Sequence, residues 1–273
     1  MRDLKVSIIL PCFNQWALTR QCLQSLFKYT RPPYQLILID NGSTDQTGAG
    51  LKEIKRNHPE INMLIVRNRE NKGAPKAFNQ GISKACGRYF LFLNNDTLVT
   101  EGWLEGLIGK AELNSRFGII GACSNKKKSR FSGSDKYAQI NKLAALNYLK
   151  NRGKYLEVPA QTSFCLLVSR EVVDQIGMFD ENYGLGTNDD HDFCLRARQA
   201  GYKIVCALDV FVYHFYHKTL GKLDMENLDR RNREYFVWKF GRPGLRYYAQ
   251  INQPYGLRGE RSFASLRNLK TFQ

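Results

Sequence analysis

The stretch KVSIILPCFNQ, residues 5–15, joins an apolar run to a polar turn and indicates the architecture of the chain. Residues 6–10 are apolar at every position except Ser7, which is typical of a strand buried on both faces of a parallel sheet. A second such run stands at 34–40, after a segment at 16–29 in which apolar residues recur with helical spacing. Strand, helix and strand in this order predict a βαβ unit.

The same alternation continues along the chain. We expect helices at 44–56, 74–84, 103–113 and 139–149, and strands at 61–66, 89–93, 117–123, 163–168 and 202–208. This rhythm predicts an α/β fold, a doubly wound, mostly parallel sheet with helices on both faces. Helical spacing at 224–239 gives way to a segment rich in Gly, Arg and Tyr, so we expect a helical, basic C-terminal extension at 221–273.

Composition restricts the class of protein. No apolar run approaches the length that crosses a bilayer, and the first residues, MRDLK, lack a signal-peptide pattern. The seven cysteines have no CxxC spacing and stand mostly in apolar surroundings, which favours reduced, buried side chains over zinc ligands or disulfides. We therefore expect a soluble, cytoplasmic protein, and leave open a peripheral contact with the inner face of the membrane.

The net charge of +16 is concentrated in two segments. Residues 126–154 hold nine Lys or Arg against Asp135, and residues 236–273 hold seven against Glu260. Such an excess favours anionic partners such as nucleotides, anionic lipid headgroups or nucleic acid, although a solubilising surface explains either segment equally well. Aromatic residues such as Tyr247 and Tyr248 lie among these cations, a pattern that nucleic-acid-binding proteins also use.

Polar residues stand where the predicted parallel strands end, which is the edge at which open α/β sheets bind ligands. The second strand ends in DNGSTD (40–45) and the fourth in NNDT (94–97). Asp40 is suited to accept a hydrogen bond from a nucleobase or ribose, but a turn with a helix cap at Ser43 or Thr44 explains these letters as well. The chain has neither a glycine fingerprint after the first strand nor a GxxxxGK[ST] loop, which argues against dinucleotide dehydrogenases and P-loop NTPases.

An acidic cluster follows a glycine-rich loop in the stretch YGLGTNDDHDFCLR, residues 183–196. The spacing of the apolar residues predicts a short helix that begins near Asp189 or Asp190 and ends at Gly201. A capping role explains one aspartate. It does not explain three aspartates beside His191 in a basic chain, so we expect an acid/base or cation-handling site, which also argues against nucleic acid in that cleft.

Six motifs together resemble the family 2 glycosyltransferases. They are VSIILPCFN (6–14), DNGSTD (40–45), NKG with NQGI (71–73 and 79–82), LNNDT (93–97), GMFDE (177–181) and DDHDFCLR (189–196). The resemblance runs from about residue 4 to 220 and implies a GT-A fold, with a nucleotide-binding half at 1–124 and an acceptor-binding half at 125–220. It also implies a divalent cation and inversion at the anomeric carbon. DNGS and NND resemble the rhamnosyltransferase-like subgroup in particular.

The resemblance assigns expected roles to single residues. The donor-binding positions are Pro11, Phe13, Asn14, Asp40, Asn41, Lys72, Asn95 and Asp96. Asp40 matches the residue that accepts from the base imide, and Lys72 one that contacts base or phosphate. Asp96 matches a direct metal ligand, His214 a histidine close to the metal or pyrophosphate, and Asp190 the general base. Without the resemblance, packing among aromatic residues would be the simpler explanation of His214 and His217.

The metal motif departs from the family pattern, because Asn94 and Asn95 stand before Asp96 and leave one carboxylate instead of two. We expect a weaker cation site, in which a histidine ligand favours Mn²⁺ over Mg²⁺. The departure leaves open a catalytically silent nucleotide- or glycan-binding module. The expected function is an inverting transfer from a UDP- or dTDP-sugar to a hydroxyl of a saccharide, lipid-linked or protein-linked acceptor, with both basic segments facing an anionic acceptor or its membrane. The motif letters do not fix the sugar, the acceptor or the oligomeric state.

Overall fold

Eight strands form the central sheet in the computed structural model, which describes residues 5–125, 136–216 and 222–251. Their order across the sheet is β3-β2-β1-β4-β8-β6-β9-β7. The strands are β1 (Val6–Cys12), β2 (Gln35–Asp40), β3 (Asn62–Arg67), β4 (Tyr89–Leu93), β6 (Phe117–Cys123), β7 (Tyr155–Val158), β8 (Cys165–Ser169) and β9 (Lys203–Phe211). Strands β3, β2, β1 and β4 are parallel, as are β6 and β9, whereas β8 runs antiparallel to both of its neighbours and β7 to β9.

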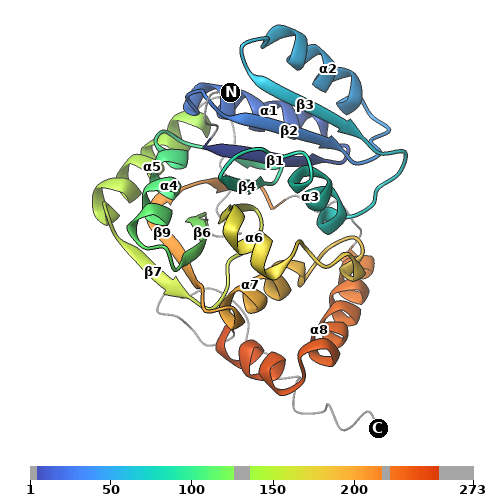
Figure 1. The fold of residues 1–273 in the computed structure, drawn as a ribbon. Coiled ribbons are helices and arrows are strands. Elements are labelled where there is room, and N and C mark those ends of the chain that lie inside the picture. The colour runs from blue at the N-terminus through green and yellow to red at the C-terminus, as the bar shows by residue number, and fades with distance from the viewer. Residues whose placement is uncertain (1–4, 126–135, 217–221, 252–273) are drawn as a thin grey trace.

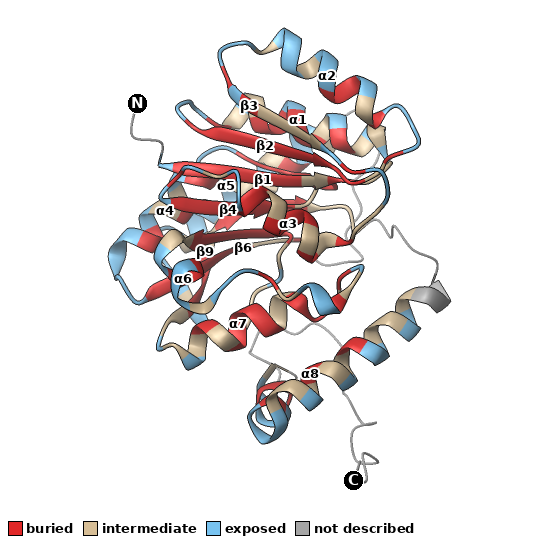
Figure 2. Cartoon of the chain, turned by 45° about the vertical axis from the view of Figure 1, so that its right-hand side comes forward, coloured by how far each residue is buried: buried red, intermediate tan, exposed pale blue. Residues whose placement is uncertain are grey.

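Helices cover both faces of this sheet (Figure 1). They are α1 (Trp16–Tyr29), α2 (Thr47–Asn57), α3 (Ala74–Ile82), α4 (Trp103–Leu113), α5 (Lys136–Asn151), α6 (Arg170–Ile176), α7 (Asp189–Gln199) and α8 (Lys222–Ile251), with a 3-10 turn, η1, at Glu181–Tyr183. Helices α1, α2 and α4 pack into one hydrophobic core, and α3, α6, α7 and α8 into the other. Alternate residues of β1 enter opposite cores, Ile8 one and Ile9 the other, and the inner strands are buried along most of their length, whereas the edge strands β3 and β7 are not (Figure 2). The predicted α/β architecture is confirmed.

A separate two-stranded ladder lies at the edge that carries the site. Strand β5 (Thr97–Leu98) pairs antiparallel with β10 (Tyr213–His214), so that His214 lies opposite Thr97. The motif at 94–97 and a histidine far along the chain therefore meet. This pairing was not predicted from the sequence, since both strands are only two residues long.

Three predictions about helices were wrong in detail. Helix α2 begins at Thr47 rather than 44, and neither Ser43 nor Thr44 caps it. Helix α8 continues to Ile251, beyond the predicted end at 239, because the chain turns at Gly241 (φ 56°) and then resumes a helix. The predicted cap at the acidic helix is also not an aspartate: α7 begins after Asn188, whose side chain makes no capping bond. The prediction that most cysteines are buried is confirmed, with Cys86 exposed.

Parts of the basic segments can be placed. Helix α5 contains the exposed cations Lys142 and Lys150, and α8 the exposed Arg242 and Arg246. Residues 126–135 and 252–273, together with His217, lie outside the described residues. No helix within the described ranges is both long enough and apolar enough to span a bilayer.

Candidate active site

A cleft of about 540 Å³ opens where the loops after β1, β2 and β4 meet the start of α7. Seven of the residues predicted for the site line it: Pro11, Phe13, Asn41, Asn95, Asp96, Asp190 and His214. Three others, Asn14, Asp40 and Lys72, do not line it and contact neighbouring loops instead. The fold therefore brings most of the predicted set to one cavity, at the expected edge of the sheet.

The loops after β1 and β2 are fastened to each other by the side chain of Asn14. Its Oδ1 accepts from the backbone N–H of Thr44 at 2.8 Å, and its own N–H donates to Ser43 Oγ at 2.9 Å. Asp45 completes the connection by accepting from the backbone N–H of Trp16 at 3.0 Å, at the start of α1. Ser43 and Thr44 are thus engaged in bonds to the loop after β1 and do not cap α2, which explains why this helix begins later than predicted.

Asp40 is almost fully buried at the end of β2. Its Oδ1 accepts from the backbone N–H of Ser43 at 2.9 Å, and its Oδ2 lies 3.5 Å from Nε of Arg67. The contact with Ser43 is the turn geometry expected as the alternative to ligand binding. Binding of a nucleobase by Asp40 stays a prediction.

Asn41 ties the loop after β2 to the loop after β3. Its Nδ2 donates to Asn71 Oδ1 at 2.9 Å and to the Gly73 carbonyl at 3.2 Å. Its Oδ1 accepts from Asn68 Nδ2 at 2.9 Å and from the backbone N–H of Lys72 at 3.1 Å. Asn41 therefore fixes the shape of the cleft wall through several residues of the loop after β3, and its contact with Lys72 is to the backbone N–H of that residue.

Asp96 and His214 form a close pair at the cleft. The His214 Nε2 and the Asp96 Oδ1 are 3.1 Å apart, and both side chains are mostly buried, at 14% and 11% exposed. The His214 ring stacks on Phe164 and leans on Tyr216, at centroid distances of 5.2 and 4.3 Å. The backbone N–H of His214 donates to Asn125 Oδ1 at 2.8 Å, so ring and backbone are both held in place.

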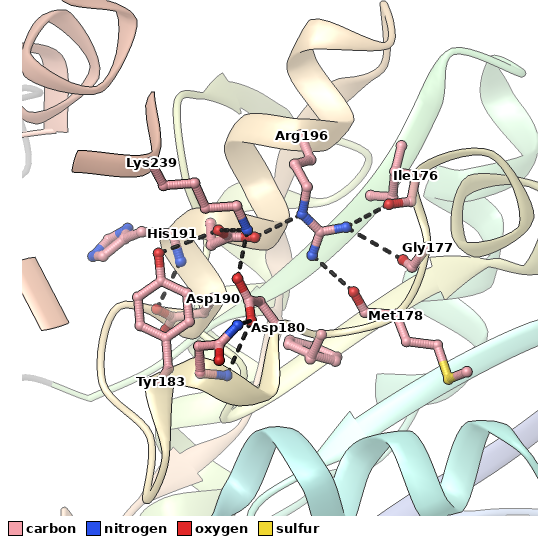
Figure 3. A network of polar contacts seen from close by, with 12 residues as sticks. Ile176, Gly177, Met178, Asp180, Tyr183, Asp190, His191, Arg196 and Lys239 are labelled. Carbon is pink, nitrogen blue, oxygen red and sulfur yellow. Dashed lines mark hydrogen bonds and ion pairs between the residues drawn. The ribbon is translucent and has the colours of Figure 1, made fainter. Parts of the chain in front are cut away.

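The three aspartates at the start of α7 lie in three different environments. Asp192 is fully buried and is bound by two cations, Arg196 Nε and Lys239 Nζ, each at 2.6 Å. Figure 3 shows Lys239 reaching from α8 towards Asp180 and α7, while the Arg196 guanidinium turns to the carbonyls of residues 176–178. Asp192 is thus held by cations and does not line the cleft.

Asp189 lines the cleft and is buried, yet its Oδ2 has no hydrogen-bond partner among the described residues. Burial first, and the nearby charge of Asp190 second, raise the pKa of Asp189 to about 8. At neutral pH this carboxyl group therefore holds a proton for much of the time.

Asp190 is only partly buried, and it also lines the cleft. Its Oδ1 accepts from the backbone N–H of His191 at 2.8 Å. The His191 Nδ1 lies 3.3 Å from the hydroxyl of Tyr247, on α8. Of the three carboxylates, Asp190 is the one that combines access to the cleft with a half-open position.

Several cleft residues were missed by the sequence reasoning. Helix α8 supplies Met225, Leu228 and Asp229, and the chain also contributes Ser163 and Tyr216. The sequence contained a signal that α8 packs against the site, because Asn232 and Lys239 recur at helical spacing with Phe236, which is buried. Polar residues on the buried stripe of a helix indicate specific partners across the interface.

Residues 7–177 match the family described as glycosyl transferase family 2, and the chain belongs to this family. The protein is therefore a glycosyltransferase, as the motifs predicted. It is 26% identical over 245 residues to glycosyltransferase AglE of Haloferax volcanii, a match that covers 88% of this chain and 76% of AglE. It is 30% identical over 125 residues to glycosyltransferase GlyG of Streptococcus pneumoniae, covering 45% of this chain but only 40% of GlyG.

Solved structures agree on the fold. The mannosyltransferase PcManGT of Pyrobaculum calidifontis, in complex with GDP-Man and Mn²⁺, has a TM-score of 0.69 at 18% identity, over 92% of this chain and 70% of that one. TarS 1–349 of S. aureus, in complex with UDP-GlcNAc, has a TM-score of 0.60 at 18% identity, over 86% and 67%. The expected GT-A fold is confirmed.

Proposed function

We propose that this glycosyltransferase moves a sugar, with inversion, from a UDP- or dTDP-sugar to a hydroxyl of a saccharide, lipid-linked or protein-linked acceptor. The observation that carries the proposal is a single cleft lined both by the Asp96–His214 pair and by the first turn of α7. Nucleotide sugars bound to PcManGT and TarS, which share the fold, support a donor of this class.

The Asp96–His214 pair fits a divalent cation. Two ligands about 2.1 Å from one ion and at a right angle lie about 3 Å apart, and the Asp96 and His214 atoms are separated by 3.1 Å. No group of three His, Cys, Asp or Glu side chains meets within the described residues, so diphosphate oxygens and water would complete the coordination. A bound cation would offset the negative charge of the leaving diphosphate. The imidazole ligand favours Mn²⁺ over Mg²⁺.

Asp190 is the proposed general base. Its carboxylate takes the proton of the acceptor hydroxyl while the acceptor oxygen forms a bond to the anomeric carbon. The bond from that carbon to the diphosphate oxygen breaks on the opposite side, and the nucleoside diphosphate leaves with the electron pair. A single displacement of this kind inverts the anomeric configuration.

Helix α5 supports a peripheral contact with an anionic membrane that carries the acceptor. Leu146 and Leu149 are 55% and 74% exposed, and the exposed cations Lys142 and Lys150 lie on the same helix. Basic residues near an anionic surface contribute about 1 kcal/mol each. Sedimentation with anionic and neutral vesicles at low salt tests this contact, and equal recovery with both would refute it without touching the transferase assignment.

The deciding experiment for the activity is a panel of UDP-, dTDP- and GDP-sugars with Mn²⁺. We expect release of nucleoside diphosphate with one uridine or thymidine donor, and thermal stabilisation by the matching nucleotide. Stabilisation without turnover, for every donor and acceptor tried, would favour the silent binding module. Salt-dependent binding of DNA or RNA without turnover would favour the nucleic-acid-binding alternative.

A further inference from the structure

The loop that leads into α7 has an unfavourable backbone conformation. Thr187 and Asn188 follow one another with positive φ angles of 68° and 62°. Left-handed backbone is uncommon outside glycine and is a true outlier for a β-branched residue such as threonine. Strain of this kind persists only where surrounding contacts enforce it, and it gathers at functional sites. Because Asp189 and Asp190 come next, their direction depends on whatever holds this loop.

One buried side chain from α8 contacts the loop at several points. Asn232 is fully buried, and its Nδ2 lies 2.9 Å from the Tyr183 carbonyl, 2.5 Å from that of Gly186 and 3.1 Å from that of Thr187. The Thr187 hydroxyl is also within reach, at 3.0 Å. The two N–H bonds of one amide group are thus aimed at the carbonyls on both sides of the loop, and the Tyr183 carbonyl also accepts from the backbone N–H of Gly186 at 3.3 Å.

The second strained residue is also held from α8. The Asn188 Nδ2 donates to Asp229 Oδ1 at 3.0 Å, and its Oδ1 accepts from the Tyr248 hydroxyl at 2.6 Å. Lys239 adds ion pairs to Asp180, before the loop, and to Asp192, after it. Contacts from α8 therefore bracket the loop on both sides, as the approach of Lys239 in Figure 3 illustrates at the α7 end.

We infer that α8 is a clamp for the loop at residues 184–188, called the acidic loop because it leads into the aspartates of α7, with Asn232 as the positioning residue that aims the carboxylate of Asp190 into the cleft. Helix α8 lies beyond residue 177, where the match to the family ends. The inference rests on the proposed role of Asp190. The C-terminal segment predicted as an extension would thus support catalysis by positioning Asp190, without itself touching the substrate.

The test compares Asn232→Ala with Asn227→Ala, an exposed asparagine on the same helix that does not line the cleft. For Asn232→Ala we expect kcat for release of nucleoside diphosphate, with the donor found in the panel, to fall about 10- to 100-fold, because small misplacements of a catalytic group are costly. The affinity for UDP with Mn²⁺ should change less than about twofold, because the donor wall is untouched. Hydrogen exchange should accelerate in residues 184–192, and Asn227→Ala should match the wild type throughout.

Tyr248→Phe provides a second, milder variant in case Asn232→Ala does not fold, since it removes only the hydroxyl that binds Asn188. We expect a several-fold loss of kcat with unchanged UDP affinity. Unchanged kcat in both variants, or a loss that follows UDP affinity, would overturn the positioning role. If the wild type turns over no donor, the proposed function fails by itself. In that case hydrogen exchange tests the clamp independently of activity. If the loop exchanges at the same rate in Asn232→Ala as in the wild type, the clamp is refuted.

Discussion

The two walls of the cleft are built in different ways. The wall after β1, β2 and β4 lies inside the family match and is held by short bonds between adjacent loops, such as those of Asn14 and Asn41. The wall formed by the acidic loop and α7 lies beyond the match, has a strained backbone, and is held by side chains from α8. The first wall is thus held by contacts among the family motifs themselves, whereas the second depends on contacts from α8, which lies outside the family match.

The loop after β3, which Asn41 binds to the first wall, meets the second wall at Gly73. A Cβ atom on this residue would lie 1.9 Å from the carbonyl oxygen of Gly184, and its φ of +83° also favours glycine. The backbone N–H of Ala74 lies 3.4 Å from the Leu185 carbonyl. The loop after β3 therefore touches the acidic loop directly, and the distance between the walls is limited by backbone packing at this point.

The largest expected effect is that of Asp190→Asn, which should impair the transfer step at the α7 wall and leave nucleotide binding at the first wall intact. In Asp190→Asn the amide keeps the shape of the carboxylate and loses its basicity, so transfer should fall about 10²- to 10⁴-fold. Affinity for the nucleoside diphosphate should stay near the wild-type value. Steady-state release of nucleoside diphosphate and calorimetry measure the two quantities.

Asp174→Asn is the matched control, because this aspartate is exposed on α6, away from the cleft. It should turn over like the wild type. Wild-type turnover in Asp190→Asn itself would remove Asp190 as the base. Asp189 would then be the next candidate, since Asp192 is occupied by Arg196 and Lys239.

Most of the fold was predictable because each long element has a clear period. The helix at Trp16–Tyr29 and the strand at Tyr89–Leu93 have the predicted bounds, since apolar spacing alone determines them. The start of α2 was not predictable, because Ser43 and Thr44 bond to Asn14 across the chain instead of capping the helix.

The site was predictable in its residue types but not in its pairings. Placing Asp96 beside His214 requires the ladder of β5 and β10, which is too short to have a period. The acidic cluster was recognised, yet its division into a cation-bound Asp192, a buried Asp189 and an accessible Asp190 depends on α8 and on burial. Neither the packing of α8 nor the burial of each aspartate can be read directly from the sequence.

The next effect concerns the first wall. We expect binding of UDP to be metal-linked, tighter with Mn²⁺ than with Mg²⁺, and weakened about tenfold or more in Asp96→Ala, because the carboxylate oxygen is lost as a ligand. His214→Ala should reduce the preference for Mn²⁺. Calorimetry with Mn²⁺, Mg²⁺ or EDTA measures these affinities, with Asp190→Asn as a variant that keeps the metal linkage. Equal affinity in EDTA for wild type and Asp96→Ala would refute the metal role.

The smallest effect is a pH-dependent stability at the second wall. Asp189 has a folded pKa of about 8, raised by burial and by Asp190, against about 3.9 for an unfolded chain. Between these values the folded state binds more protons than the unfolded state, so its stability falls as pH rises. The amide introduced by Asp189→Asn does not titrate, and this variant should therefore gain stability over the wild type by at least about 1 kcal/mol between pH 5 and pH 8. Thermal unfolding across this range measures the gain, with Asp174→Asn expected to give a constant difference. A constant difference for Asp189→Asn as well would mean that Asp189 is ionised in the folded protein across this range, and would refute the raised pKa of this carboxyl group.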